Sequence, residues 1–490
     1  MPPSHPILSC EASRAWEHAI FQGDEAKEWP AMLRAGRALA QAIRRDAEEI
    51  GGLPDAGRIL VLAGKGHNGG DALLAARELC AGRPDARVEV VFAFGERSLR
   101  PLAARAWRDL VHGARAQVAK VPAPTGAYDL CLDGVFGFPF RPPAPSHVVA
   151  LLQRVNAAPI RFRAAVDLPS AGVFRADFTY ATGILKEPVV GAPAAGRVCY
   201  LDLGFFPAGA GGDARVLLPE TLDPLRGWRE PTTDKRSHGH AFVLGGSGAY
   251  PGAVLLTVLS ALRSGAGLVT AFVPEALVAA FAARAPEAIW VGWPQTPAGG
   301  LALEGEHLLR ARIDRATALL IGPGLGREPE TLALAASVAG WSPVPMVIDA
   351  DGLQREVVCV GRAPRVLTPH AGELERIGGR QVLRAGITLV EKGPVTRICH
   401  GPTVLHSFFG GPVLARGGSG DVLAGLIGGL LAQAPADPLG AAARGVVWHG
   451  LAADFLAREK GPAATCISEL VERLAPALRE GSARPCAGGS

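Results

Sequence analysis

The chain has 490 residues, too many for one ordinary hydrophobic core, so two domains are expected. Apolar residues make up 48% and charged residues 20% of it, a balance typical of globular proteins. The net charge of +4 comes from scattered Lys and Arg rather than a basic block, so we expect no nucleic-acid partner. No apolar stretch is long enough to cross a membrane, and the N-terminus lacks a signal-peptide pattern. The eight cysteines form no Cys-x-x-Cys pair, so a cytoplasmic protein with reduced thiols is expected.

The first half begins with helical spacing of apolar residues over 31–40 and then alternates between strands and helices. The expected strands are residues 58–63, 88–94, 130–132, 164–166, 178–181 and 197–201, and the expected helices are 71–80 and 102–112. Alternation of this kind predicts a mostly parallel sheet with helices on both faces.

The second half alternates in the same way. Its expected strands are residues 241–244, 268–272, 318–321, 346–348, 365–367 and 388–391, and a helix is expected over 253–264. Stretches rich in Gly, Ala and Pro over 207–212 and in helix breakers over 228–234 place a boundary between the halves. The sequence therefore predicts an α/β protein of two α/β/α sandwich domains, residues 1–222 and 223–490.

Glycine and acidic residues follow three strands of the first half. A glycine-rich turn over 64–71 ends the first strand, and such a turn can hold a phosphate on its backbone N–H groups or can simply be structural. Asp133 and Asp167 stand where two further strands stop. Carboxylate, amide and hydroxyl oxygens together suit a hard cation rather than zinc.

These segments resemble the motifs of the Rossmann-like epimerase domain that repairs hydrated nicotinamide nucleotides, over roughly residues 11–205. The resemblance implies that K⁺ is held by Asn68, Asp133 and Ser170, and that Asp167 is an acid/base group. It implies a substrate site made of His67, Asn68, Gly69, Gly70, Asp71, Gly137, Phe138 and Arg141. The chain departs from the family pattern at His67, at Ala171 and around Lys186, so a binding module without activity is an alternative for this half.

The most informative stretch of the second half is Gly417-Gly418-Ser419-Gly420-Asp421, which runs into an apolar helical pattern. Backbone N–H groups at such a helix N-terminus can bind phosphate, and Asp421 can take a proton from an attacking hydroxyl. A glycine-rich helix cap with an ordinary Asp is the structural alternative. Five further strand ends carry small or polar residues, at 245–252, 322–326, 349–353, 368–373 and 391–396.

This set resembles the ADP-dependent NAD(P)H-hydrate dehydratase domain, a ribokinase-like domain, over about residues 235–475. The resemblance implies that Asp421 is catalytic and that Ala253, Gly324 and His370 contact the hydrated dinucleotide. It implies that the nucleotide is bound by Lys392, Gly393, Pro394, Val395, Thr396, Gly417, Gly418, Ser419 and Gly420.

Together the two resemblances imply a bifunctional repair enzyme. The first domain would interconvert the R and S epimers of NAD(P)H hydrate, and the second would dehydrate the S form with ADP, giving AMP and phosphate. K⁺ and Mg²⁺ would be the cations, and a homo-oligomer is expected. The alternative is an ATP-dependent kinase of a small alcohol, a vitamin or a sugar, with a degenerate N-terminal binding domain. The segment around His370 and the fused first domain argue against this kinase.

Overall fold

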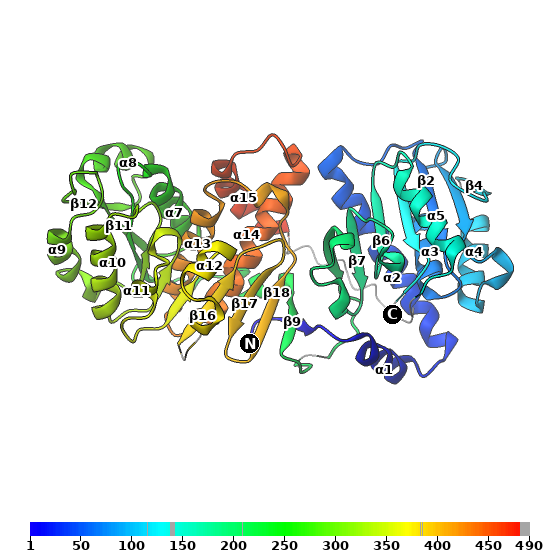
Figure 1. Ribbon diagram of the computed structural model, residues 1–490, viewed down its shortest axis with the longest axis horizontal. Helices are drawn as coiled ribbons and strands as arrows, with labels where there is room; N and C mark the ends of the chain where they lie inside the picture. The colour runs from blue at the N-terminus through cyan, green and yellow to red at the C-terminus, as the bar shows by residue number, and fades with distance from the viewer. Residues whose placement is uncertain (115, 138–142, 208, 383, 385, 481–490) are drawn as a thin grey trace. The chain divides into compact units, whose positions relative to one another are not determined.

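The computed structural model describes residues 1–480 except 115, 138–142, 208, 383 and 385. The chain divides into two compact units (Figure 1). The N-terminal unit contains His5–Val216 with Arg458–Gly461, and the C-terminal unit contains Met1–Ser4, Leu217–Ala457 and the chain from Pro462 onward. Within the described residues, no helix is both long and apolar enough to span a membrane.

The sheet of the N-terminal unit has seven strands in the order β4-β3-β2-β5-β6-β7-β8, and every neighbouring pair is parallel. The strands are β2 (Arg58–Ala63), β3 (Arg87–Phe92), β4 (Gln117–Lys120), β5 (Leu130–Gly134), β6 (Arg163–Val166), β7 (Phe178–Thr182) and β8 (Arg197–Leu201). The helices are α1 (Cys10–Phe21), α2 (Glu25–Ala47), α3 (His67–Cys80), α4 (Pro101–Gly113) and α5 (Ser146–Ala157). The expected parallel sheet of this half is confirmed.

Strand β2 explains why this sheet is covered on both faces. Ile59 and Val61 belong to the core cluster that includes α2, α3 and α4, whereas Leu60 and Leu62 belong to the cluster that includes α5. Successive side chains of a strand point to opposite faces, so an unbroken apolar run needs helices on both sides.

Helix α3 begins at His67, four residues before the start predicted from the sequence. The glycines that suggested a turn lie inside the first helical turns instead. A Cβ atom on Gly69 would come within 2.4 Å of the Gly64 carbonyl oxygen, and one on Gly70 within 2.3 Å of Met32 Cε. These glycines therefore serve close packing of α3 against β2 and α2.

The second sheet, whose strands β10 to β18 lie in the C-terminal unit, has the strand order β1-β9-β18-β17-β16-β15-β14-β13-β10-β11-β12. Neighbours from β12 through β16 pair in parallel, whereas β16, β17 and β18 pair antiparallel. The strands are β1 (Ser4–Pro6), β9 (Ala214–Leu217), β10 (His240–Leu244), β11 (Leu268–Pro274), β12 (Ile289–Trp293), β13 (Ala318–Ile321), β14 (Met346–Ile348), β15 (Arg365–Leu367), β16 (Ile387–Glu391), β17 (Thr396–His400) and β18 (Thr403–Ser407). The hairpin of β17 and β18 is absent from the sequence prediction.

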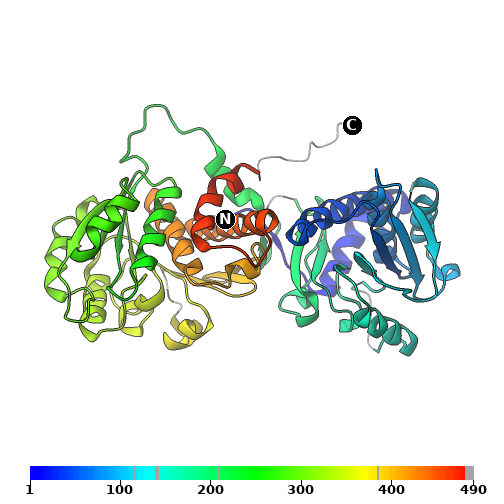
Figure 2. The same ribbon diagram turned by 90° about the horizontal axis from the view of Figure 1, so that it is seen from above.

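Helices cover both faces of this sheet, as Figure 2 shows. One core cluster joins it to α7 (Pro251–Arg263), α8 (Val278–Arg284), α13 (Ser419–Gln433), α14 (Pro438–Lys460) and α15 (Ile467–Glu480). The other joins it to α9 (Glu306–Arg310), α10 (Pro329–Trp341) and α11 (Arg355–Val358). The remaining short helices are α6 (Asp223–Arg226) and α12 (Ala371–Arg376). The prediction of an α/β sandwich in this half is confirmed.

Candidate functional site

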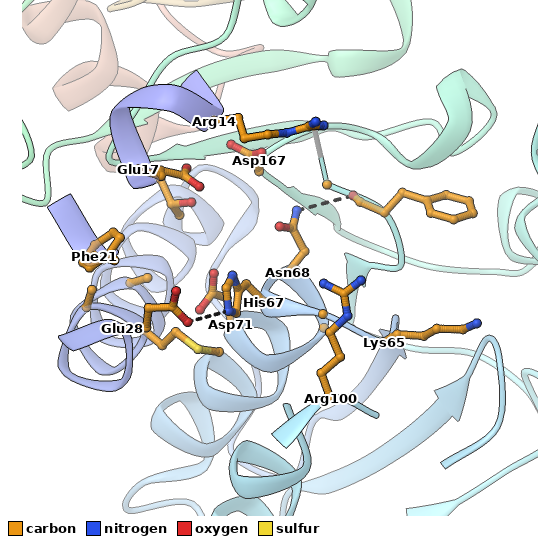
Figure 3. Close-up of a pocket in the computed structure, with 18 of the residues that line it drawn as sticks. Arg14, Glu17, Phe21, Glu28, Lys65, His67, Asn68, Asp71, Arg100 and Asp167 are labelled. Carbon is orange, nitrogen blue, oxygen red and sulfur yellow. Dashed lines mark hydrogen bonds and ion pairs between the residues drawn. The ribbon is translucent and has the colours of Figure 1, made fainter. Parts of the chain in front are cut away.

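A cavity of about 580 Å³ lies at the carboxyl ends of β2, β5 and β6 in the N-terminal unit (Figure 3). Its volume is in the range of small-molecule sites, and parallel sheets bind ligands at this edge. The residues predicted from the sequence that line it are His67, Asn68, Gly69, Asp71, Gly137 and Asp167. Gly70 packs behind the cavity wall against Met32. Phe138 and Arg141 lie outside the described residues.

The predicted cation ligands come together beside this cavity. The Ser170 hydroxyl donates to Asp133 Oδ1 at 2.7 Å, and the Ser170 backbone N–H donates to Asp133 Oδ2 at 2.8 Å. The amide nitrogen of Asn68 donates to the Val166 carbonyl at 3.0 Å. The Asn68 amide oxygen lies so close to Gly137 that a Cβ there would approach it to 2.5 Å.

The oxygen atoms of these three residues are of the kind that binds a hard cation. Asp133 is completely buried, and burial raises the pKa of its carboxyl to about 6 against the hydrogen bonds from Ser170 and Val135. A nearby cation would stabilise its ionised form. Structural zinc sites are built mainly from Cys and His, whereas Asn68, Asp133 and Ser170 offer oxygen atoms.

Asp167 follows β6 in a left-handed backbone conformation, with φ 70°. The Lys186 ammonium donates to Asp167 Oδ1 at 2.5 Å, and both side chains are at most 3% exposed. The other carboxyl oxygen, Asp167 Oδ2, has no hydrogen-bond partner in the described structure. In the sequence, the segment around Lys186 stands out only as a departure from the family pattern. In the structure, Lys186 contacts Asp167, the predicted acid/base group.

The site of the C-terminal unit is built around the start of α13. Gly418 has φ 92°, which is the left-handed region that favours glycine, and the helix begins at Ser419. Asp421 lies in the first turn. Burial and then the charge of Asp349 raise the pKa of the Asp421 carboxyl to about 7, against the lowering effect of Lys392. A carboxyl group that titrates near neutral pH is suited to general-base work.

Lys392, at the end of β16, connects three strand ends. Its ammonium donates to Asp349 Oδ1 at 2.8 Å and lies 3.7 Å from Glu373 Oε2. Burial lowers the pKa of Lys392, but these carboxylates raise it overall. A Cβ on Gly420 would lie 3.1 Å from the Lys392 ammonium, so α13 begins beside this lysine. Asp349 and Glu373 belong to strand ends found in the sequence but were not predicted as site residues.

The predicted dinucleotide residues line neighbouring strand ends. Gly324 has φ 68°, and a Cβ on it would lie 3.2 Å from Ala253 Cβ, so these two residues are adjacent. His370 is the N-cap of α12: its Nδ1 accepts from the backbone N–H groups of Gly372 and Glu373, which leaves the proton of a neutral ring on Nε2. His370 is exposed.

The remaining predicted nucleotide residues lie on two segments. Gly393, Pro394 and Val395 connect β16 to β17, and Thr396 is the first residue of β17. Gly417 is exposed and precedes α13, whereas Ser419 is its first, buried residue. The two sheets, with glycines and acidic side chains at their strand ends, are typical of an α/β enzyme that binds ligands at such edges.

Comparison with known proteins agrees with this class. The NAD(P)H-hydrate dehydratase family matches residues 241–475, and the family described as YjeF-related protein N-terminus matches residues 30–187. The chain belongs to the family of bifunctional NAD(P)H-hydrate repair enzymes. A member from Gloeobacter violaceus is 38% identical over 87% of this chain and 89% of its own, and one from Escherichia coli is 31% identical over 90% and 88%.

A solved structure is also similar to part of this chain. The ADP/ATP-dependent NAD(P)H-hydrate dehydratase of Bacillus subtilis, co-crystallised with ATP and Mg²⁺, is 27% identical to this chain. The match covers 54% of this chain and 98% of that one, with a TM-score of 0.44.

Proposed function

We propose that the chain repairs hydrated NADH and NADPH in two steps. The N-terminal unit interconverts the R and S epimers, and the C-terminal unit dehydrates the S form with ADP, giving AMP and phosphate. The proposal is carried by one observation on this chain, which belongs to the repair-enzyme family: each of its two candidate sites has a potential acid/base carboxyl group. These groups are Asp167 beside Lys186 and Asp421 at the start of α13.

Dehydration needs a better leaving group than hydroxide. Asp421 accepts the proton of the substrate hydroxyl, whose oxygen forms a bond to the β-phosphorus of ADP while the bond from that phosphorus to the AMP oxygen breaks. The lone pair of the ring nitrogen then forms a double bond to the carbon, and phosphate leaves with the electron pair of the carbon–oxygen bond. Loss of a proton from the adjacent carbon restores the double bond of NADH or NADPH.

The backbone N–H groups of Gly417 to Gly420 and the ammonium of Lys392 are suited to hold the transferred phosphoryl group. Donors fixed in place before the reaction stabilise developing charge without reorganising, which is usually the largest contribution to catalysis. ADP is expected to enter as its Mg²⁺ complex, so the metal arrives with the co-substrate.

In the N-terminal unit we assign a K⁺ ion to Asn68, Asp133 and Ser170. When bound, K⁺ supplies a fixed positive charge beside the cavity. The carboxylate of Asp167 accepts the proton of the substrate hydroxyl, and its contact with Lys186 keeps the carboxylate in place. His67, Asn68, Gly69, Asp71 and Gly137, which are predicted to bind substrate, line the same cavity as this carboxylate. Assembly into a homo-oligomer stays an expectation from the family resemblance.

The test is recovery of NADH absorbance from a mixture of both NADH hydrate epimers with ADP, Mg²⁺ and K⁺. Full conversion is expected, because the R form must first become the S form. If conversion stops near the fraction of S epimer in the mixture, the result contradicts the epimerase activity and leaves the dehydratase activity standing. No recovery with ADP or ATP, together with phosphorylation of small alcohols by ATP, would favour the kinase alternative.

A further inference from the structure

Four carboxyl groups line the cavity of the N-terminal unit: Glu17 of α1, Glu28 of α2, Asp71 of α3 and Asp167 after β6 (Figure 3). Two of them have ion-pair partners, since Asp167 contacts Lys186 at 2.5 Å and Glu28 lies 3.2 Å from the His67 ring. Glu17 and Asp71 have no such partner among the described residues.

The two carboxyl groups without ion pairs favour their protonated forms. Burial raises the pKa of Glu17 to about 7. The charge of Lys186 lowers this pKa, whereas the charges of Asp167 and Glu28 raise it further. Burial, then Asp167 and Glu17, raise the pKa of Asp71 well above its ordinary value. One oxygen of Asp71 is buried without a hydrogen-bond partner, as far as the structure describes the chain. The cavity therefore holds a carboxyl group paired with an ammonium, Asp167, and exchangeable protons nearby.

The chemistry of the proposed substrate requires both kinds of group. Water adds to an enamine double bond with the hydroxyl on the carbon next to nitrogen, so the epimeric carbon of the hydrate carries both a hydroxyl and the ring nitrogen. Inverting that carbon requires one of its bonds to break and re-form. Breaking the carbon–nitrogen bond needs a base for the hydroxyl proton and an acid that protonates the departing nitrogen. This inference rests on the epimerase activity proposed above.

We propose that Glu17 is the proton donor of epimerisation and acts together with Asp167. Asp167 takes the hydroxyl proton, the carbon–oxygen double bond forms, and the carbon–nitrogen bond breaks with its electron pair on nitrogen, which receives the Glu17 proton. After rotation, the nitrogen attacks the opposite face of the aldehyde. The nitrogen proton returns to Glu17 and the Asp167 proton to the new hydroxyl, so nothing is consumed.

Glu17 is better placed for this role than Asp71. Asp71 is 7% exposed and lies within the first turns of α3, whereas Glu17 is half-buried on α1 and extends from that helix toward the same space as Asp167 (Figure 3). A proton donor has to lose and regain its proton in each cycle, which suits a group that titrates near neutral pH. Two carboxyl groups with different environments, one paired with an ammonium and one not, are a recurring acid/base arrangement.

The experiment compares Glu17→Gln with Glu11→Gln in the full chain. Glu11 is exposed on the same helix, so its substitution removes the same charge outside the cavity. Conversion of purified S epimer to R epimer is followed by chromatography without ADP, from about pH 5 to 9, with the buffer rate subtracted. We expect Glu17→Gln to lower kcat about 100-fold or more with little change in KM, Glu17→Asp to recover part of it, and Glu11→Gln to match the wild type.

The pH profile separates proton donation from a structural role. The wild-type rate should fall as the pH rises through about 7, because Glu17 must be protonated. The Glu17→Gln variant should lose this alkaline fall. The charged groups that face Glu17 and interact electrostatically with its carboxyl group are Lys186, Asp167, Glu28 and Asp71. Dehydration of the S form with ADP should be unchanged, which checks that the variant is folded.

Two outcomes would overturn the assignment. If the Glu17→Gln variant has the kcat of the wild type and keeps the alkaline fall in rate, Glu17 is not the donor. If the variant changes only in KM, Glu17 is a binding residue. In both cases the proposed function stands, because the wild type epimerises. A wild-type chain that converts S to R no faster than buffer would instead contradict the epimerase activity, and the role of Glu17 with it.

Discussion

Backbone strain is concentrated beside the two sites. Among the described non-glycine residues, positive φ angles occur at Gln22, Asp167, Ala171 and Ala350. The last three follow strand ends: Asp167 and Ala171 come after β6, beside the predicted K⁺ ligand Ser170, and Ala350 follows Asp349, which contacts Lys392. Strained residues of this kind persist only where the surrounding structure holds them. The strand ends of both units are therefore held in conformations that their own residues disfavour.

Replacing Ala171 by Gly should stabilise the N-terminal unit. Ala171 has φ 58°, where a side chain costs about 1–2 kcal/mol, and part of this gain is offset by the greater freedom of Gly in the unfolded chain. We expect the free energy of unfolding, measured in urea, to rise by about 0.5–1 kcal/mol. Ala192, with φ −68°, is the matched control, and Ala192→Gly should destabilise. Equal destabilisation by both substitutions would contradict strain at Ala171.

Asp421→Asn should abolish dehydration while the nucleotide still binds. An amide cannot accept the hydroxyl proton, so kcat should fall about 10²–10⁴-fold. The wild-type rate should rise with pH through about 7, because the base must be ionised. Turnover retained in the variant, or a wild-type rate independent of pH, would remove Asp421 from this role.

The same substitution should have a stability effect of predictable sign. Because the folded-state pKa of Asp421 is raised, its contribution to stability is full at acid pH and is lost as the pH rises through about 7. The Asn variant should therefore gain thermal stability relative to the wild type above that pH and lose the advantage below about pH 4. Thermal unfolding at both ends of this range measures the difference.

Packing of α13 against α7 positions the turn that is predicted to bind phosphate. A Cβ on Gly425 would lie 2.0 Å from Ser260 Oγ and 2.2 Å from the Thr257 carbonyl oxygen, and one on Gly429 would lie 2.1 Å from Ser264 Oγ. The two helices therefore approach backbone to backbone. The Thr257 hydroxyl also donates to the Asp421 carbonyl at 3.2 Å, which joins α7 to the first turn of α13. The position of the Asp421 turn thus depends on residues farther along the same helix.

Gly425→Ala should consequently affect both stability and binding. The added methyl group meets backbone atoms that cannot move aside, so we expect a loss of about 1–3 kcal/mol in the free energy of unfolding. The shift of α13 should also raise the KM for ADP. Gly227→Ala is the control, because a Cβ there meets no atom within 4 Å and the residue has φ −72°. Wild-type stability of Gly425→Ala would mean that the helices can separate without cost.

The sequence predicts elements well where apolar runs end at glycine or acidic residues. Strands β2, β8 and β13 have the predicted bounds, since each is a short apolar run. The β17–β18 hairpin escaped prediction because polar residues such as Arg397 and His400 interrupt its apolar pattern. The start of α3 was placed too late because its glycines are typical of a turn, whereas their use in packing depends on the tertiary structure.

The same distinction holds for the sites. Asp133, at a strand end, and Asp421, at a helix N-terminus preceded by glycines, can be found from the sequence, because both kinds of position are typical of ligand sites in parallel α/β sheets. Glu17 could not be found in this way, because it lies in the middle of helix α1. The contact of Lys186 with Asp167 could not be found either, because it joins residues that no local sequence pattern connects. The roles of Phe138 and Arg141 stay predictions, because both residues lie outside the described part of the chain.

At the scale of the whole molecule, each unit has its own cores and its own site, so their cation requirements should be separable. Replacing K⁺ by tetramethylammonium, which is too large for the Asp133 and Ser170 oxygens, should slow epimerisation about tenfold or more. Dehydration of purified S epimer with Mg²⁺ and ADP should be unaffected. K⁺ should also raise the unfolding temperature of the N-terminal unit, and Asp133→Asn should remove this effect. Equal K⁺ dependence of both reactions would contradict the assignment.

The first four residues belong to the C-terminal unit. The backbone N–H of Leu218 and the hydroxyl of Thr221 both donate to the Pro3 carbonyl. During synthesis, Pro3 leaves the ribosome long before Leu218 is made. At about 5–20 residues per second this delay is roughly 10–40 s. The segment around Pro3 therefore stays without these hydrogen-bond partners while the N-terminal unit is completed, and it is available to chaperones in that interval.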